Sequence, residues 1–362
     1  MSNHTAERTI RTAVLGFGVS GRVFHSPLLA ANPDYSLRFI TTSNEERSRQ
    51  ARGLYPTATV LNQPEDVFQH ADDIDLVVIG TPPSTHYQLA SNAIEHGMHV
   101  VVDKPFVASS EQGEDLIRKA ERAGVSLTVF QNRRWDADFL TVQDLVRQDA
   151  MGPIATFESR FEWWQPDGFR SWKGAASLDE AGGILYDLGS HLIDQALQLF
   201  GPVQDVYGQT TRYSGASTDA DEDAFVVLRH ASGTRSRLTM SGLAAQPGPR
   251  FHVFGTRGTY LKWGLDGQEP ALDAGKSPND DDFGFEPETA WGSLSSGATQ
   301  QPIPAQRGDY PRFYRLLSRH LFEGTPIPVD PKDAVQVLHI IEQVHRLPGM
   351  TTSHHQLTTI GS

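Results

Sequence analysis

The stretch Thr12-Ala13-Val14-Leu15-Gly16-Phe17-Gly18-Val19-Ser20-Gly21 joins a short apolar run directly to three spaced glycines. The apolar run predicts a buried strand, and the following segment from Val19 to Ala31 is expected to form a helix. In that setting Gly16 permits a tight turn, Gly18 lets the backbone approach a pyrophosphate, and Gly21 allows the helix to pack closely on the strand. The stretch therefore predicts a dinucleotide-binding turn, although an ordinary strand–helix turn can carry the same glycines.

Apolar runs and helix-length segments alternate outward from this turn, from Ile10 to Gln131. This alternation is typical of parallel βαβ units. The clearest helix is expected over Glu111 to Ala123, with Gly124 as its stop signal. We therefore predict an α/β fold in which residues 1–132 form a Rossmann domain with a doubly wound parallel sheet. The expected strands are Thr12–Gly16, Leu37–Thr42, Ala58–Leu61, Leu76–Gly80, His99–Val102 and Ser126–Phe130.

The pattern changes after about residue 150, where alternating, β-rich segments begin. They predict that residues 133–362 form a C-terminal α+β domain with a large, mostly antiparallel sheet. Late helices are expected over Tyr310–Phe322 and Lys332–Arg346, and Gly264–Gly308 is expected to be a long surface excursion. The expected strands are Ile154–Trp163, Val203–Thr211, Ala224–Arg229, Ser236–Ser241, Phe251–Phe254 and Thr259–Trp263.

The overall composition excludes several classes of protein. The 362 residues carry 31 Lys plus Arg against 44 Asp plus Glu, a formal net charge of −13, which predicts no nucleic-acid partner. No apolar run approaches the roughly 18 residues of a membrane span, so no membrane association is expected. The chain has no Cys, which excludes disulfides, thiolate catalysis and Cys-ligated zinc, and we expect no metal site. The polar segment Met1 to Arg11 does not resemble a secretion signal, so a cytoplasmic location is expected.

The end of the second expected strand bears on the choice of cofactor. NAD-binding turns normally place a carboxylate about 20 residues after the glycines, to hold the adenosine ribose. Here Ser43 and Asn44 occupy that place, no carboxylate precedes Glu45, and Arg47 lies one turn further on. Such groups can donate hydrogen bonds to a 2′-phosphate, so we expect NADP rather than NAD. Alternatively, Ser43 or Asn44 only caps the next helix.

Two further strand ends are expected to reach the same cleft, because ligands bind at the carboxyl ends of parallel strands. One is the turn Thr81 to His86, in which Ser84 could equally be a helix cap. The other is Asp103-Lys104-Pro105. An ammonium held there could bind a reacting oxygen, whereas the simpler alternative is an ordinary surface lysine.

A second candidate for chemistry lies in the C-terminal half. Asp187 and His191 are four residues apart, one helical turn, and share a stripe distinct from the apolar face of their helix. A carboxylate beside an imidazole fixes its tautomer and raises its basicity, which suits a proton acceptor. A capping aspartate and a structural histidine are the alternative.

The order of the glycine turn, the Lys104-Pro105 step and the Asp187/His191 pair resembles the Gfo/Idh/MocA family of nicotinamide-dependent sugar and polyol oxidoreductases. The resemblance spans nearly the whole chain, and it implies an open sheet that covers the substrate and often builds an oligomer interface. The usual Glu-Lys-Pro motif is Asp103-Lys104-Pro105 here. Four strings look like the NADP-dependent scyllo-inositol dehydrogenase branch of the family: Asn132–Asp136, Tyr186–Gln195, Pro249-Arg250 and Gly264–Glu269.

The resemblance assigns roles to individual residues. It implies catalysis by Lys104, Asp187 and His191. Arg134, Trp172 and Lys173 are expected to face a polyol or sugar substrate, with core packing as the alternative for Trp172. Cofactor contacts are expected from Gly16, Phe17, Gly18, Gly21, Ser43, Asn44, Arg47, Thr81, Pro82, His86 and Lys104. A homo-oligomer is also expected.

Three functions remain open at this point. The first is hydride transfer between a secondary alcohol of a cyclic polyol or sugar and the nicotinamide of NADP. The second is a non-catalytic regulator that senses a dinucleotide, which has no need for Lys104, Asp187 and His191 together. The third is an NAD-dependent glycosidase, in which transient oxidation promotes elimination. The missing strand-end carboxylate disfavours tight binding of NAD, and with it the third function.

Overall fold

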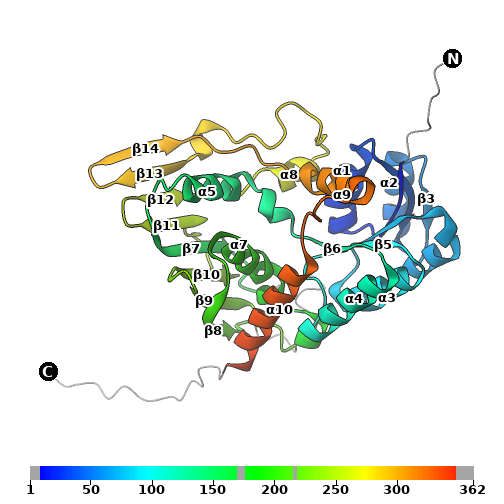
Figure 1. Cartoon of the computed structure of the whole chain (residues 1–362), viewed down its shortest axis with the longest axis horizontal. Coiled ribbons are helices and arrows are strands. Elements are labelled where there is room, and N and C mark those ends of the chain that lie inside the picture. Colours follow the sequence, from blue (N-terminus) through cyan, green and yellow to red (C-terminus); the bar gives the residue numbers. More distant parts are fainter. Residues whose placement is uncertain (1–8, 169–175, 215–217, 348–362) are drawn as a thin grey trace.

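Two β-sheets organise residues 9–168, 176–214 and 218–347, which are the residues that the computed structural model describes (Figure 1). Within these ranges the first sheet has six parallel strands in the order β3-β2-β1-β4-β5-β6. This is the predicted doubly wound Rossmann sheet. Its strands are β1 (Ile10–Leu15), β2 (Tyr35–Thr41), β3 (Thr59–Leu61), β4 (Leu76–Ile79), β5 (His99–Asp103) and β6 (Leu127–Phe130).

Helices cover the parallel sheet, and local signals set their ends. The Ser109 side chain caps the N-terminus of α4 by accepting a hydrogen bond from the Gln112 N–H, and Gly124 ends the helix at φ +67°. These helices are α1 (Ser26–Ala30), α2 (Glu45–Leu54), α3 (His86–Glu95) and α4 (Ser110–Ala123). A fifth helix, α5 (Ala137–Arg147), follows β6 and lies beside the second sheet (Figure 1). A π-helical turn spans Ser20–His25, and 3-10 turns span Pro64–Asp73, Pro83–Thr85 and Asn132–Trp135.

The second sheet has eight strands in the described residues, in the order β14-β13-β12-β11-β7-β10-β9-β8. Neighbouring strands are antiparallel except for the parallel pair β7 and β10, so the predicted mostly antiparallel sheet is confirmed. Its strands are β7 (Ile154–Glu162), β8 (Val203–Thr211), β9 (Asp223–His230), β10 (Arg235–Ser241), β11 (Phe251–Gly255), β12 (Thr259–Lys262), β13 (Gly292–Ser296) and β14 (Thr299–Ile303).

Some helices of the C-terminal half contact this sheet, and others contact helical segments of the N-terminal half (Figure 1). They are α7 (Ser190–Phe200), α8 (Gln268–Asp273), α9 (Pro311–Glu323) and α10 (Pro331–Arg346). Shorter 3-10 turns span Leu178–Glu180 and Glu288–Ala290, and a π-helical turn spans Leu185–Gly189. No helix in the described ranges has both the length and the apolar character that crossing a membrane requires.

The segment Gly264–Gly308 departs from the predicted surface excursion. It contains α8 and the hairpin β13–β14, which extends the second sheet at one edge. β14 is largely exposed and β13 is mostly partly buried, and neither has the apolar alternation by which strands are recognised in a sequence. At the start of this segment Asp266 and Gln268 are buried, although both are polar.

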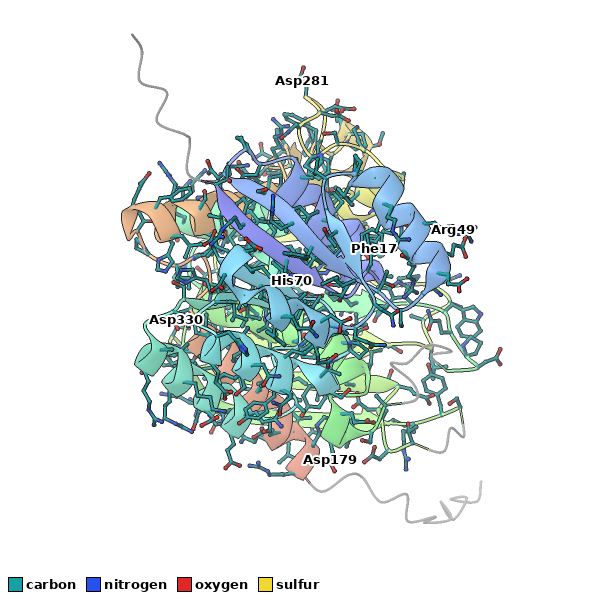
Figure 2. All side chains as sticks on the ribbon, turned by 90° about the vertical axis from the view of Figure 1, so that its right-hand side faces the viewer. Phe17, Arg49, His70, Asp179, Asp281 and Asp330 are labelled. Carbon is teal, nitrogen blue, oxygen red and sulfur yellow. The ribbon has the colours of Figure 1, made fainter. Side chains whose placement is uncertain are left out.

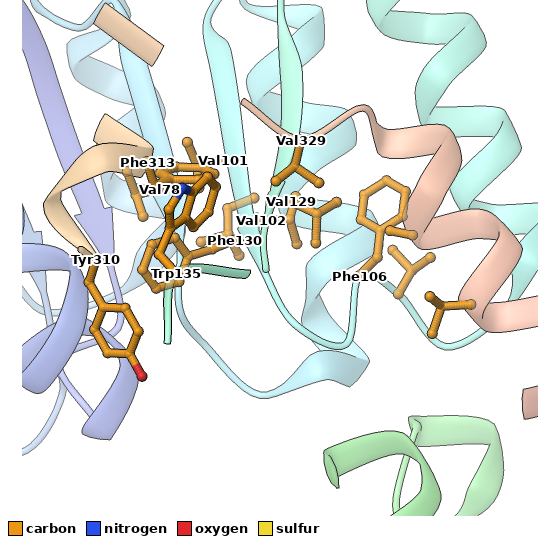
Figure 3. Close-up of a cluster of buried hydrophobic side chains, with 14 of the residues drawn as sticks. Val78, Val101, Val102, Phe106, Val129, Phe130, Trp135, Tyr310, Phe313 and Val329 are labelled. Carbon is orange, nitrogen blue, oxygen red and sulfur yellow. The ribbon is translucent and has the colours of Figure 1, made fainter. Parts of the chain in front are cut away.

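The C-terminal segment returns to the N-terminal half and packs against it. The Tyr314 hydroxyl lies 2.7 Å from Nδ1 of His25, and the Tyr35 hydroxyl donates to the Tyr314 carbonyl at 2.8 Å. Buried side chains of β4, β5 and β6 pack with Tyr310, Phe313 and Val329 of this segment (Figure 3). These contacts fix the second domain against the parallel sheet and thereby position the cleft described next.

Candidate active site

A cleft of about 1350 Å³ lies where the carboxyl ends of the parallel strands meet the second domain. Figure 2, viewed from the right-hand side of Figure 1, shows the N-terminal half with Phe17 labelled beside helix α2, which carries Arg49. Both halves of the chain line the cleft. Among its described lining residues are Gly16, Phe17, Gly18, Ser43, Arg47, Thr81, Pro82, Asp103, Lys104, Asn132, Arg133, Asp187, His191 and Glu269.

The glycine turn has a geometry that suits a bound dinucleotide. Gly16 has φ +91°, and its N–H donates to Oγ1 of Thr41 at 3.0 Å. A Cβ on Gly21 would lie 2.0 Å from the Gly16 carbonyl oxygen, so the helix and strand approach too closely for any side chain there. A Cβ on Gly18 would meet nothing nearer than Nη1 of Arg47 at 3.9 Å, so the cleft-facing backbone is open. Gly21 thus acts through packing, while Gly16, Phe17 and Gly18 form the cleft wall.

The polar residues that follow β2 have two different roles: some line the cleft and one caps the next helix. Ser43 and Arg47 line the cleft. Asn44 instead caps α2, because its side chain accepts a hydrogen bond from the Arg47 N–H at 2.9 Å. The structure therefore gives Asn44 the capping role that the sequence left as an alternative. Glu65, which the sequence did not single out, also lines this part of the cleft.

The turn after β4 lines the cleft through Thr81 and Pro82, with His86 buried behind it. The two ring nitrogens of His86 lie 2.8 Å from the Thr81 carbonyl and 3.1 Å from the Pro105 carbonyl. Burial lowers the pKa of His86, whereas its contacts with the carbonyls of Thr81, Phe106 and Pro105 act to raise it. His86 thus joins two strand-end turns and acts on the cleft indirectly, by holding both walls.

Lys104 and Asp187 meet across the cleft from opposite halves of the chain. Nζ of Lys104 donates to Oδ1 of Asp187 at 2.8 Å and to its backbone carbonyl at 2.9 Å. The spacing from Asp187 to His191 predicted a partnership on one helix, but it gave no sign of this contact with Lys104. Asp187 lies in the π-helical turn Leu185–Gly189 that leads into α7, and such turns often mark functional sites.

His191 follows one turn later, near the start of α7. Its side chain lines the same cleft as Lys104 and Asp187 and is 3% exposed. The ring meets the edge of Phe161, with centroids 6.2 Å apart and planes at 84°. An imidazole, a carboxylate and an ammonium group therefore line one cleft.

Of the residues expected to face the substrate, only Arg134 is among those that the structure describes, and it is held in ion pairs. Arg134 donates two hydrogen bonds to Asp194, at 2.6 and 2.8 Å, and a third to Asp333 at 2.9 Å. This pairing clamps Arg134 between α7 and α10, so the structure gives no support for the expected substrate contact. Its neighbour Arg133 lines the cleft instead. Trp172 and Lys173 lie outside the described residues.

Arg133 also lines the cleft, although the sequence had assigned it no role. Its Nη2 donates to Oε2 of Glu269 at 2.8 Å, and its Nη1 lies 3.4 Å from Oδ2 of Asp136. Burial acts to lower the pKa of Arg133, but Tyr310, Asp136 and Glu269 raise it overall, so the guanidinium is charged. The available signal was its place three residues after the end of β6, which neighbours β5, the strand that Lys104 follows directly.

Two buried polar residues from distant segments, Gln195 and Arg250, form a hydrogen-bonded chain that ends at the Arg133 carbonyl. Gln195 donates to the Arg133 carbonyl at 2.8 Å and accepts from Nη2 of Arg250 at 2.8 Å. The Arg250 guanidinium lies 4.1 Å from the ring centre of Phe161, and its Nε lies 3.3 Å from Asp138. The motif arginine of Pro249-Arg250 is thus fully buried and acts on the cleft only through the residues that it holds.

Comparisons with known proteins agree with this geometry. Residues 10–131 match the model of the oxidoreductase family with an NAD-binding Rossmann fold, and residues 139–261 match the GFO/IDH/MocA C-terminal domain. The chain belongs to the GFO/IDH/MocA oxidoreductase family. The resemblance deduced from the sequence is thereby confirmed, and the chain is an oxidoreductase with a nucleotide-binding Rossmann domain.

Relatives in this family match over nearly the whole chain. The scyllo-inositol 2-dehydrogenase (NADP(+)) IolW of Bacillus subtilis (strain 168) is 35% identical over 92% of each chain. The uncharacterized oxidoreductase YdgJ of Escherichia coli (strain K12) is 35% identical, over 96% of this chain and 98% of the relative. The solved structure of the oxidoreductase yvaA from Bacillus subtilis superposes with a TM-score of 0.86 at 33% identity, covering 94% of this chain and 96% of that one.

Proposed function

We propose that this oxidoreductase uses NADP to oxidise a secondary alcohol of a cyclic polyol, such as an inositol, or of a sugar, and catalyses the reverse reduction. The observation that carries the proposal is the meeting of Lys104 and Asp187, with Nζ and Oδ1 2.8 Å apart, in a cleft shared with His191 and the glycine turn. Phosphate-binding backbone and proton-transfer side chains therefore face the same space. Among relatives, the name of IolW points to scyllo-inositol.

The residues that would hold the cofactor belong to the N-terminal half. The backbone of Gly16 to Gly18 would receive the pyrophosphate, because no side chain separates it from the cleft. Thr81 and Pro82 would form the neighbouring wall. When bound, the nicotinamide supplies the site that accepts or returns a hydride.

Proton transfer falls to the chain's own residues. His191 accepts the hydroxyl proton of the substrate as general base. Lys104 has three N–H donors, of which two are directed to Asp187, so the third is available for the reacting oxygen. Asp187 is therefore the residue that orients Lys104. In the reverse direction His191 returns the proton.

Preference for NADP over NAD rests on Ser43 and Arg47. Both line the cleft beyond the end of β2, where a carboxylate would repel a 2′-phosphate. Arg47 Nη1 lies 3.9 Å from the position of a Cβ on Gly18, which places a guanidinium beside the glycine turn. Glu65 opposes this preference by bringing one carboxylate to the cleft. We expect the two donors to prevail, because charge-assisted hydrogen bonds to a phosphate are strong.

We also propose that the chain assembles with copies of itself through the outward face of the second sheet. Partly buried apolar residues lie on that face, between the fully buried residues of the same strands; examples are Phe225, Val227, Phe254 and Leu261. Covering such a surface stabilises an oligomer. Light scattering of the purified protein tests this directly, and a monomeric mass would refute it.

One assay separates the proposed function from its alternatives. The protein is incubated with NADP⁺ or NAD⁺ and a panel of inositols, sugars and aryl glycosides, while reduced nicotinamide and released aglycone are followed by absorbance. We expect reduced nicotinamide to accumulate with a polyol or sugar, faster with NADP⁺. Aglycone release without net reduction would identify a glycosidase, and no turnover with tight dinucleotide binding would identify a sensor.

A further inference from the structure

The string Gly264–Glu269 has a defined place in the fold that the proposed reaction does not explain. Asp266 accepts a hydrogen bond from the Ala137 N–H at 2.8 Å. Gln268 donates to the Trp135 carbonyl at 3.0 Å and accepts from the Tyr310 N–H at 2.8 Å. Because Asp266 and Gln268 are both buried, these bonds clamp the start of α8 to the segment that follows β6.

These bonds of Asp266 and Gln268 position the carboxylate of the next residue, Glu269, in the cleft. Glu269 follows Gln268 directly, its side chain is 40% exposed, and it lines the cleft together with Arg133. Oε2 of Glu269 lies 2.8 Å from Nη2 of Arg133, whereas Oδ2 of Asp136 lies 3.4 Å from Nη1. Glu269 is thus the closer of the two carboxylates and the one on the cleft side, since Asp136 is buried.

The pairing matters because a guanidinium in a substrate cleft is otherwise a binding site for acidic groups. Arginine presents a rigid fork that matches a carboxylate or phosphate with two parallel hydrogen bonds. Here an acidic substrate would have to displace the Glu269 carboxylate or lie beside it, and like charges in such a site repel. A neutral hydroxyl meets no such repulsion, and it can accept a hydrogen bond from Arg133 or donate one to Glu269.

The other cation near the reacting groups is paired in the same manner. Lys104 lies 2.8 Å from Oδ1 of Asp187, so its charge is also matched by a cleft carboxylate. Arg47 lies near Gly18, on the cofactor side of the cleft. Within the described lining, the cations on the substrate side are therefore already neutralised by the chain itself.

We propose that Glu269 is a specificity-determining residue that occupies the Arg133 fork and so selects neutral polyols and sugars against acidic ones, such as uronates and sugar phosphates. The inference rests on the proposed function, since it assumes that the alcohol binds in this cleft. It goes further by naming the charge class of the substrate and the residue that sets it. Removing the carboxylate should expose the fork to an acidic ligand.

The test compares two ligands that differ only in one group, D-glucose and D-glucuronate. Each is titrated as an inhibitor of the best neutral polyol substrate found in the panel, with the NADP-loaded wild type, Glu269→Gln and Glu269→Ala. We expect wild type to bind D-glucuronate more weakly than D-glucose. Both variants should shift the ratio of the two inhibition constants about tenfold or more towards D-glucuronate, since a freed guanidinium can form a charge-assisted bond.

Glu65→Gln is the matched control, because it removes one carboxylate from the lining of the same cleft without touching Arg133. An equal shift in Glu65→Gln would overturn the inference in favour of the total cleft charge. An unchanged ratio in both Glu269 variants, or a wild type that already prefers D-glucuronate, would also overturn it.

Failure of the proposed function gives a different result. If wild type oxidises no polyol or sugar, that function is wrong. The ion pair is then tested by calorimetric titration of D-glucuronate into the NADP-loaded proteins. Binding gained in Glu269→Gln and absent in Glu65→Gln would still support the role of Glu269, and binding gained in neither would refute it.

Discussion

The glycine turn and the Arg133–Glu269 contact line one cleft, but they are built in different ways. The turn consists of six consecutive residues, and its backbone packs so closely that a Cβ on Gly21 would lie 2.0 Å from the Gly16 carbonyl oxygen. The contact joins side chains 136 residues apart, and buried bonds from Gln195 and Gln268 hold it in place. The first region needs the absence of side chains at Gly16, Gly18 and Gly21. The second needs a polar network that joins segments far apart in the sequence.

The largest expected effect separates the two regions by function. His191→Ala removes the general base of the substrate side, which should reduce kcat by about 10² to 10⁴. NADPH affinity should stay unchanged, because the glycine turn is intact. Steady-state kinetics and a fluorescence titration of NADPH measure the two quantities. His339→Ala, on the exposed face of α10, is the control. Equal kcat values in His191→Ala and wild type would show that another group takes the proton.

The next effect tests the buried network behind Arg133. Arg250→Met leaves Asp138 buried without its ion-pair partner, which should lower the free energy of unfolding by about 3 to 5 kcal/mol. Arg237→Met breaks the surface pair of Arg237 with Glu158 and should cost less than about 1 kcal/mol. Urea unfolding of the two variants gives the comparison. Similar losses in both would mean that the buried network does not stabilise this side of the cleft.

A smaller effect is expected on the preference for NADPH over NADH, which depends on the end of β2. Ser43→Asp places a carboxylate where the sequence lacks one, so it should shift binding from NADPH towards NADH by about tenfold or more. Ser48→Asp adds the same charge further along α2, in a groove that adjoins the cleft at Ser43 but is not lined by the glycine turn, and should change the ratio less. Fluorescence titrations with NADPH and NADH measure the ratio of the two affinities in each protein. Tighter binding of NADH by wild type would contradict the proposed preference.

The smallest effect concerns the backbone of the turn itself. Gly21→Ala forces a Cβ to 2.0 Å from the Gly16 carbonyl oxygen, which should destabilise the fold by about 1 to 3 kcal/mol and weaken NADPH binding. Gly53→Ala, in α2 with nothing within 4 Å of its Cβ, should instead stabilise the protein by about 0.5 to 1 kcal/mol. Thermal unfolding measures both. If Gly21→Ala were as stable as Gly53→Ala, the turn would tolerate a side chain at Gly21.

The same contrast explains what the sequence could predict. Both sheets were predictable, since their buried strands have apolar runs or alternation, whereas the hairpin strands β13 and β14 have neither. The glycine turn was readable because its geometry is local. Sequence spacing did not show that Lys104 pairs with Asp187, that Asn44 only caps α2, or that Arg133 rather than Arg134 lines the cleft. These outcomes depend on how residues from separate segments pack in three dimensions.

The central claim is that the cleft transfers a hydride from a secondary alcohol to the nicotinamide. Its most direct test uses scyllo-inositol deuterated at carbon, incubated with wild type and NADP⁺, with the reduced cofactor isolated and weighed by mass spectrometry. The account predicts NADPH one mass unit heavier than the product from unlabelled inositol, together with a parallel loss of signal in His191→Ala. NADPH without deuterium would contradict the account.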